Sequence, residues 1–74
     1  MYRQRYFVNG RFNREDGPAV ECVNGDKAWY INGKHHRVDG PAVEYPDGTK
    51  YYYLNGKEYS YDYWNVARKM PWAL

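Results

Sequence analysis

Residues 4–26 read QRYFVNGRFNREDGPAVECVNGD and residues 27–49 read KAWYINGKHHRVDGPAVEYPDGT, and this near-duplication decides the fold. Aligned without gaps, the two stretches share 10 of 23 residues. A third copy begins at Lys50, and Asn55-Gly56 follows Asn32-Gly33 at the same 23-residue spacing. A fixed period predicts an array of identical supersecondary units. We therefore expect one domain over residues 1–74, divided into repeat 1 (4–26), repeat 2 (27–49), a partial repeat 3 (50–59) and a C-terminal helix (60–70).

Glycine-containing pairs mark the turns of each repeat. Asn-Gly between alternating apolar residues is a strong hairpin signal, because a type I′ turn needs positive φ at both central residues. Each repeat contains one such pair, and Asn24-Gly25 and Asp47-Gly48 are predicted to turn the chain into the next repeat. Asp-Gly-Pro should break a strand, since proline has no amide donor. The resulting fold class is mainly β, an antiparallel hairpin meander with short arms after each Asn-Gly and strands near 4–8, 19–23, 28–32, 42–46 and 50–54.

Alternation along these strands predicts two different faces. The expected core face carries Tyr6, Val8, Val20, Cys22, Trp29, Ile31, Val43, Tyr45, Tyr52 and Leu54. The opposite face is expected to carry an aromatic column of Phe7, Tyr30 and Tyr53, with Glu21 and Glu44 nearby. One thin sheet cannot bury both faces. Two outcomes stay open: the C-terminal helix covers the column, or it packs elsewhere and leaves the column exposed.

The third repeat changes character after Tyr59, where a helix is predicted. Ser60 is a favourable N-cap residue, and Asp62 in the first turn complements the positive end of the helix dipole. Tyr59 and Trp64 occupy the two positions of a hydrophobic staple, and Pro71 ends the segment. The predicted role of the helix is to cover the end of the repeat array.

Composition excludes several classes of function. A single cysteine, Cys22, excludes an intramolecular disulfide, and with His35 and His36 it makes no zinc set of standard spacing. Adjacent strand residues point to opposite faces, so the two histidines cannot chelate together. We find no nucleophile–base pair and no phosphate loop, and we therefore predict no enzyme, no cofactor and no metal. Without a long apolar run, we expect a cytoplasmic protein that does not contact a membrane.

The pattern Tyr/Trp-x-Ile-Asn-Gly-Lys-x-His-x-x-Asp-Gly, followed by Tyr-x-Asp-Gly, resembles the MORN repeat over about residues 4–59. It is most similar to divergent MORN-like repeats of small phage, giant-virus and bacterial proteins. Arg14, Arg37 and Val38 stand where MORN repeats usually have glycine, and Pro18 and Pro41 are additional. The resemblance implies a hairpin meander with non-catalytic roles: scaffolding, dimerisation, protein binding and sometimes anionic-lipid binding. By analogy, it implies a phage-encoded accessory factor that acts in the host cytoplasm. Such a factor would bind, and could inhibit, a host protein such as a defence nuclease, in the manner of an anti-CRISPR protein.

We accordingly predict a small non-enzymatic binding protein with a protein partner. Tyrosine and tryptophan are enriched at binding hot spots, and the candidate interface comprises Phe7, Glu21, Tyr30, Lys34, Glu44, Tyr53 and Trp64. A homodimer through the same face or an edge strand is a further expectation. The alternative is a nucleic-acid or nucleotide binder that stacks bases on its rings. The formal charge of only +2, with carboxylates mixed into the same strands, disfavours that alternative.

Overall fold

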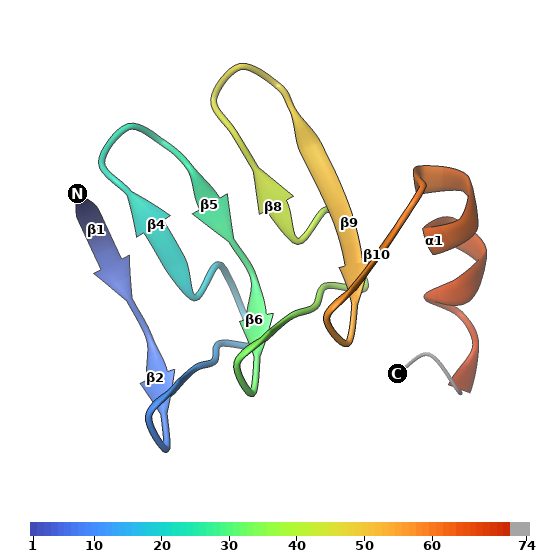
Figure 1. The fold of residues 1–74 in the computed structure, drawn as a ribbon, viewed down its shortest axis with the longest axis horizontal. Coiled ribbons are helices and arrows are strands. Elements are labelled where there is room, and N and C mark those ends of the chain that lie inside the picture. The colour runs from blue at the N-terminus through green and yellow to red at the C-terminus, as the bar shows by residue number, and fades with distance from the viewer. Residues whose placement is uncertain (72–74) are drawn as a thin grey trace.

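Tight hairpins form at Asn9-Gly10, Asn32-Gly33 and Asn55-Gly56 in the structure, a computed structural model that describes residues 1–71 (Figure 1). Asn32 and Gly33 have φ values of 54° and 83°, and the equivalent pairs in the other repeats are also positive. This confirms the predicted type I′ geometry. The hairpins join β2 (Phe7–Val8) to β3 (Arg11–Phe12), β6 (Tyr30–Ile31) to β7 (Lys34–His35), and β9 (Lys50–Leu54) to β10 (Lys57–Tyr59).

Wider hairpins alternate with the tight ones and link the repeats. The Gly25 amide donates to the Cys22 carbonyl at 3.0 Å, and Gly48 repeats this bond to Tyr45. These turns connect β4 (Val20–Cys22) to β5 (Lys27–Ala28) and β8 (Val43–Glu44) to β9. With β1 (Tyr2–Arg5), they form a six-stranded antiparallel sheet in the order β1-β4-β5-β8-β9-β10. The strands lie side by side in a single layer, and the molecule measures 34 × 32 × 17 Å (Figure 1).

Most strands are shorter than predicted because each repeat changes pairing partner midway. The Tyr6 amide donates to the Ala19 carbonyl at 2.8 Å, whereas the Tyr6 carbonyl accepts from the Asn13 amide at 3.0 Å. Trp29 makes the same two bonds, with Ala42 and His36. Ala19 and Ala42 are 0% exposed at these crossing points, the positions where a strand changes its pairing partner. Of the predicted strands, only 50–54 forms over its full length; 19–23 and 42–46 are shorter, and 4–8 and 28–32 are each interrupted.

Strand register corrects the predicted faces. Val43 pairs with Tyr51, and Glu44 pairs with Lys50. Cross-strand partners project to the same face, so the valine lies on the side of Tyr51 and Tyr53, and the glutamate lies on the side of Tyr52. The prediction that Val20, Cys22, Val43 and Tyr45 share the face of Tyr52 and Leu54, with Glu21 and Glu44 beside Tyr53, is therefore wrong. Alternation within one strand cannot reveal its register against the next, which the turn at Asp47-Gly48 sets here, with the Tyr45 amide donating to the Thr49 carbonyl across it.

The helix α1 (Tyr61–Ala67) packs on the face that carries Tyr6, Trp29, Tyr52 and Leu54, which we call the helix face. Ser60 is its N-cap, as predicted, and accepts a hydrogen bond from the Tyr63 amide at 3.3 Å. The helix ends at Ala67, short of the predicted residue 70. Trp64 and Ala67 form a buried cluster with Leu54, bordered by Tyr52 and Tyr59. The predicted staple residue Tyr59 stacks on Tyr63, with ring centroids 5.0 Å apart, and also borders the Trp64 cluster.

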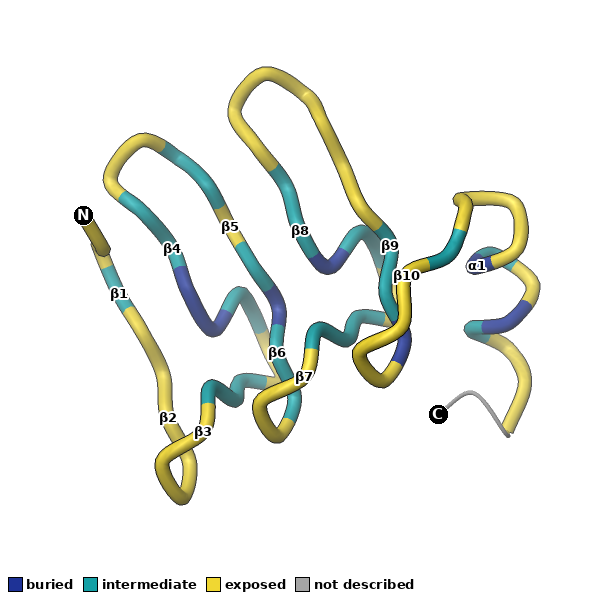
Figure 2. The backbone as a smooth tube through the Cα atoms, in the orientation of Figure 1, coloured by how far each residue is buried: buried dark blue, intermediate teal, exposed yellow. Residues whose placement is uncertain are grey.

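Burial is confined to the crossing points and to the contact with the helix (Figure 2). The buried apolar residues of the described chain are Ala19, Val20, Trp29, Ala42, Leu54, Trp64 and Ala67. Because α1 lies on the helix face, the opposite face, which we call the aromatic face, has no helix over it. Of the two arrangements that stayed open from the sequence, the structure therefore shows the one that leaves the aromatic column uncovered.

Candidate functional site

Five rings stack in a continuous row across the aromatic face. The centroid distances are 4.7 Å for Phe7–Phe12, 5.1 Å for Phe12–Tyr30, 4.2 Å for Tyr30–His35 and 4.8 Å for His35–Tyr53. We call this row the aromatic ladder. Each tight hairpin contributes a cross-strand pair, Phe7 with Phe12 and Tyr30 with His35, and Tyr53 pairs with Glu58 at the end.

Sequence reasoning found three of these rings and missed Phe12 and His35. Both lie on the short arms after Asn-Gly, which were not assigned to a face. A signal was present, because a two-residue turn places residues 7 and 12 directly opposite each other, and 30 and 35 likewise. Applied to every repeat, this pairing would have predicted the full ladder.

Backbone hydrogen bonds between successive hairpins fix the spacing of the ladder. The Arg14 amide donates to the Tyr30 carbonyl at 3.0 Å, and the Gly33 amide donates to the Phe12 carbonyl at 2.8 Å. The Asn32 amide donates to the Asn13 side-chain oxygen at 2.7 Å. The same three bonds recur one repeat later, where the acceptor for the Asn55 amide is Nδ1 of His36, at 2.9 Å. The ladder is thus a direct product of the 23-residue period.

The two histidines have separate structural roles. His35 stacks within the ladder, whereas His36 borders a hollow on the helix face together with Trp29 and Arg37. Burial lowers the pKa of both imidazoles. Nδ1 of His36 must be unprotonated to accept its hydrogen bond, and Nδ1 of His35 is buried with no hydrogen-bond partner among residues 1–71. Both groups are therefore neutral at pH 7.

A shallow groove of about 420 Å³ runs beside the ladder on the aromatic face. Its apolar lining includes Val20, Cys22, Ala28, Val43, Tyr45 and Tyr51. Tyr45 and Tyr51 meet edge to face at 6.1 Å and are 41% and 39% exposed, and Phe7 at the ladder's start is 53% exposed. Burial, with a smaller contribution from nearby tyrosines, raises the pKa of Tyr30, so its hydroxyl stays protonated. The five rings of the ladder are uncharged at pH 7, and Asp26, Lys27 and Glu58 complete the lining of the groove.

Charge is found at the two ends of the ladder. The Arg5 guanidinium lies 5.9 Å from the Phe7 ring centroid and 4.7 Å from that of Tyr2. At the other end, Glu58 is the cross-strand partner of Tyr53. A partner that covers the ladder would therefore meet a cation at one end and a carboxylate at the other.

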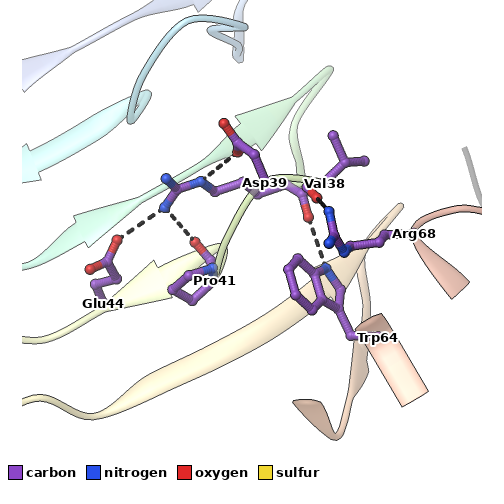
Figure 3. A network of polar contacts seen from close by, with 7 residues as sticks. Val38, Asp39, Pro41, Glu44, Trp64 and Arg68 are labelled. Atoms are coloured by element: carbon purple, nitrogen blue, oxygen red, sulfur yellow. Dashed lines mark hydrogen bonds and ion pairs between the residues drawn. The ribbon is translucent and has the colours of Figure 1, made fainter. Parts of the chain in front are cut away.

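The helix face is held together by an arginine in each repeat (Figure 3). Nε of Arg37 donates to Asp39 at 2.8 Å, and its NH1 donates to the Pro41 carbonyl and to Glu44, both at 3.0 Å. Its guanidinium carbon lies 3.8 Å from the Trp29 ring centroid. The guanidinium also lowers the pKa of the Asp39 carboxyl. These contacts make Arg37 a structural residue that holds the Asp-Gly-Pro turn against the sheet.

Arg14 repeats this arrangement in repeat 1, with bonds to Asp16 at 3.0 Å and to the Pro18 carbonyl at 3.3 Å, and its guanidinium carbon 4.2 Å from the Tyr6 ring centroid. In repeat 3, Trp64 takes the position over the aromatic ring, 4.6 Å from Tyr52. Its Nε1 donates to the Arg37 carbonyl at 3.0 Å, and Arg68 donates to the Val38 carbonyl at 3.0 Å (Figure 3). Trp64 of the helix thus takes the place of the arginine that repeat 3 lacks, since the equivalent position is Ser60.

Of the seven predicted interface residues, the structure brings together Phe7, Tyr30 and Tyr53. Glu21 accepts from Gln4 at 3.2 Å, and Glu44 binds Arg37, which places both carboxylates on the helix face. Lys34 pairs with Ile31 and is adjacent to His35, so it projects away from the ladder. Trp64 is 3% exposed and belongs to the core, where a partner cannot reach it.

The same ladder geometry bears on the kind of ligand. A base stacks on the flat face of an aromatic ring. Inside the ladder, each ring lies 4.2–5.1 Å from the next at interplanar angles of 30–42°, so neighbouring rings occupy the space over the inner ring faces. This arrangement disfavours base stacking and suits broad contact with an apolar protein surface.

Residues 1–71 contain no group of three or more His, Cys, Asp or Glu side chains placed to hold a metal ion. Within the same range, no helix is long and apolar enough to cross a membrane. Comparison with protein-family models, curated proteins and solved structures gives no match to the chain.

Proposed function

We propose that the chain is a non-catalytic binding protein whose working surface is the aromatic face. One observation carries this proposal: α1 packs against Tyr52 and Leu54 on the helix face and leaves the aromatic ladder and its groove uncovered. A contiguous exposed apolar patch of this kind marks an interaction site on a small protein. Exposed tyrosines such as Tyr45 and Tyr51 supply large contact area at low entropic cost, which is why tyrosine is enriched at hot spots.

The partner we propose is a protein with a complementary apolar surface. The inner rings of the ladder lie against one another, and Arg5 and Glu58 lie at its opposite ends, which disfavours a nucleic-acid strand as the partner. Through the resemblance to MORN-like repeats of phage proteins, we further propose a host protein as the partner, with a defence nuclease as one candidate.

The test compares two exposed tyrosines on different surfaces. Tyr51 lies on the aromatic face and is 39% exposed, whereas Tyr63 lies on α1 and is 54% exposed. The immobilised chain is used to isolate a partner from host lysate, and the purified partner is then titrated with each variant. We expect Tyr51→Ala to weaken binding at least tenfold, the range of hot-spot losses, and Tyr63→Ala to leave it unchanged. Equal affinities for both variants and the parent chain would contradict the proposal.

Oligomeric state is measured first, by size-exclusion chromatography with light scattering on the chain alone. A dimer that Tyr51→Ala dissociates would make a second copy the occupant of the aromatic face. A monomer that gains mass only with the isolated partner is the result we expect.

A further inference from the structure

The contacts that join one repeat to the next leave an identifiable edge on repeat 1. At each internal junction, a hairpin makes three hydrogen bonds with the segment before it. The carbonyl of its first arm (Tyr30 or Tyr53) accepts one of them, and its Asn and Gly amides donate the other two. The counterparts in repeat 1 are the Phe7 carbonyl and the amides of Asn9 and Gly10. No residue in 1–71 accepts from these two amides.

The segments that fill this edge elsewhere define what it accepts. At the first junction, Phe12 supplies a carbonyl, Asn13 a side-chain oxygen and Arg14 an amide. At the second, His35, His36 and Arg37 supply the same three groups, with an imidazole nitrogen in place of the amide oxygen. The ring of the first residue also stacks on the hairpin that follows, as Phe12 does on Tyr30 at 5.1 Å. The required pattern is an aromatic residue or His, then Asn or neutral His, then a residue with a free amide.

The same segment continues along the neighbouring strand. The Ala19 amide donates to the Ala28 carbonyl, and the Ala42 amide donates to the Tyr51 carbonyl, both at 2.9 Å. The counterpart acceptor in repeat 1 is the carbonyl of Arg5, on the outer side of β1. The edge therefore extends from Gly10 back to Arg5 and matches a segment of about eight residues with an internal Asp-Gly-Pro turn.

We propose that this open edge of repeat 1 binds an extended segment of another protein that reproduces the inter-repeat contacts, a case of strand addition. A second copy of this chain does not fit as the occupant. At its C-terminal end the acceptor position is Tyr59, whose ring stacks on Tyr63, and Ser60 already caps α1. This mismatch prevents head-to-tail growth of a filament. The site adjoins the aromatic face at Phe7, the repeat 1 counterpart of Tyr30, but it is built from backbone groups at the edge of repeat 1.

The probe is a fluorescein-labelled peptide of residues 11–21, RFNREDGPAVE, added to the full-length chain. Fluorescence anisotropy measures affinity, and ¹H–¹⁵N correlation spectra locate the site. We expect saturable binding with the largest shift changes at the Asn9 and Gly10 amides. Asn13→Ala in the peptide removes one acceptor and should weaken binding about fivefold, the effect of one hydrogen bond.

Backbone methylation supplies a matched pair of controls. Methylation of the Arg14 amide removes the donor to the Phe7 carbonyl and should abolish binding. In the chain, the Asn13 amide donates within its own repeat, so a peptide methylated there should still bind. Absence of binding, shift changes away from Asn9 and Gly10, or equal affinity of the two methylated peptides would each overturn the proposal.

Discussion

Replacing Arg37 by alanine should be one of the most damaging single changes outside the buried core. The side chain is only 20% exposed and makes hydrogen bonds to Asp39, Glu44 and the Pro41 carbonyl. Its guanidinium also covers the ring of Trp29 at 3.8 Å. Removal therefore exposes an indole, leaves a carbonyl without its partner and unpairs Glu44.

The expected loss can be estimated from these contacts. We assign about 1 kcal/mol to each of the bonds with Glu44 and the Pro41 carbonyl, and about 0.5–1 kcal/mol to the cation–π contact. The contact with the exposed Asp39 is left near zero. The total loss in free energy of unfolding is then about 2–3 kcal/mol. For a domain of this size, that lowers the melting midpoint by on the order of 10–20 °C.

Arg14→Ala is the matched comparison, because Arg14 occupies the same position in repeat 1. It lacks a counterpart to the Glu44 bond, and its ring contact with Tyr6 is longer, at 4.2 Å. We therefore expect Arg37→Ala to cost about 1 kcal/mol more than Arg14→Ala, with Arg37→Lys intermediate because lysine lacks the planar fork. Urea unfolding followed by tryptophan fluorescence gives these values. Equal losses at the two arginines, or a loss below about 0.5 kcal/mol at Arg37, would refute the reasoning.

Three further predictions concern the histidines, the repeat glycine and the helix. Because burial lowers the folded-state pKa of His35 and His36 below 6.5, their contribution to stability is complete above that pH and is lost as pH falls through the folded values. In the double variant His35→Phe/His36→Asn, which copies repeat 1, the urea midpoint should change less with pH between about pH 7.5 and 5.5 than in the parent chain. An equal pH dependence in both would contradict the role given to the two histidines. Gly40→Ala would place a Cβ 2.8 Å from the Arg37 guanidinium carbon. In a double-mutant cycle, Gly40→Ala should therefore lower the free energy of unfolding strongly in the parent chain and only slightly in the Arg37→Ala variant. Trp64→Ala should cost about 3–5 kcal/mol and unfold most of the chain at 37 °C by circular dichroism, whereas Trp64→Phe should stay folded with a lower midpoint.

The turns could be predicted because their chemistry is local. Asn32-Gly33 has positive φ at both residues, as its place between two short strands predicts, whereas at Asn24-Gly25 only the glycine has positive φ. Ser60 is likewise a local signal, since its hydroxyl satisfies an amide within the first helical turn. The 23-residue period then placed these local features in the right order along the chain.

Register and helix placement could not be predicted in the same way. The face of Val43 depends on its pairing with Tyr51, which the conformation of the intervening chain decides. The side on which α1 packs depends on the contacts of Trp64 with the Tyr52 ring and the Arg37 carbonyl. These two residues come together only in the folded chain. The prediction of the candidate site was wrong for the same reason. The aromatic column was predicted correctly, but four residues predicted to share its face do not lie on it: Glu21, Lys34, Glu44 and Trp64.

The central claim, that the aromatic face is the working surface, is tested most directly by photo-crosslinking at single positions. A benzophenone amino acid replaces Tyr51 in one variant and Tyr63 in another, and each is irradiated with the partner isolated by the parent chain. If the aromatic face is the binding surface, we expect a covalent adduct from position 51 and none from position 63. An adduct from position 63 alone would contradict the claim and assign binding to the outer surface of the helix.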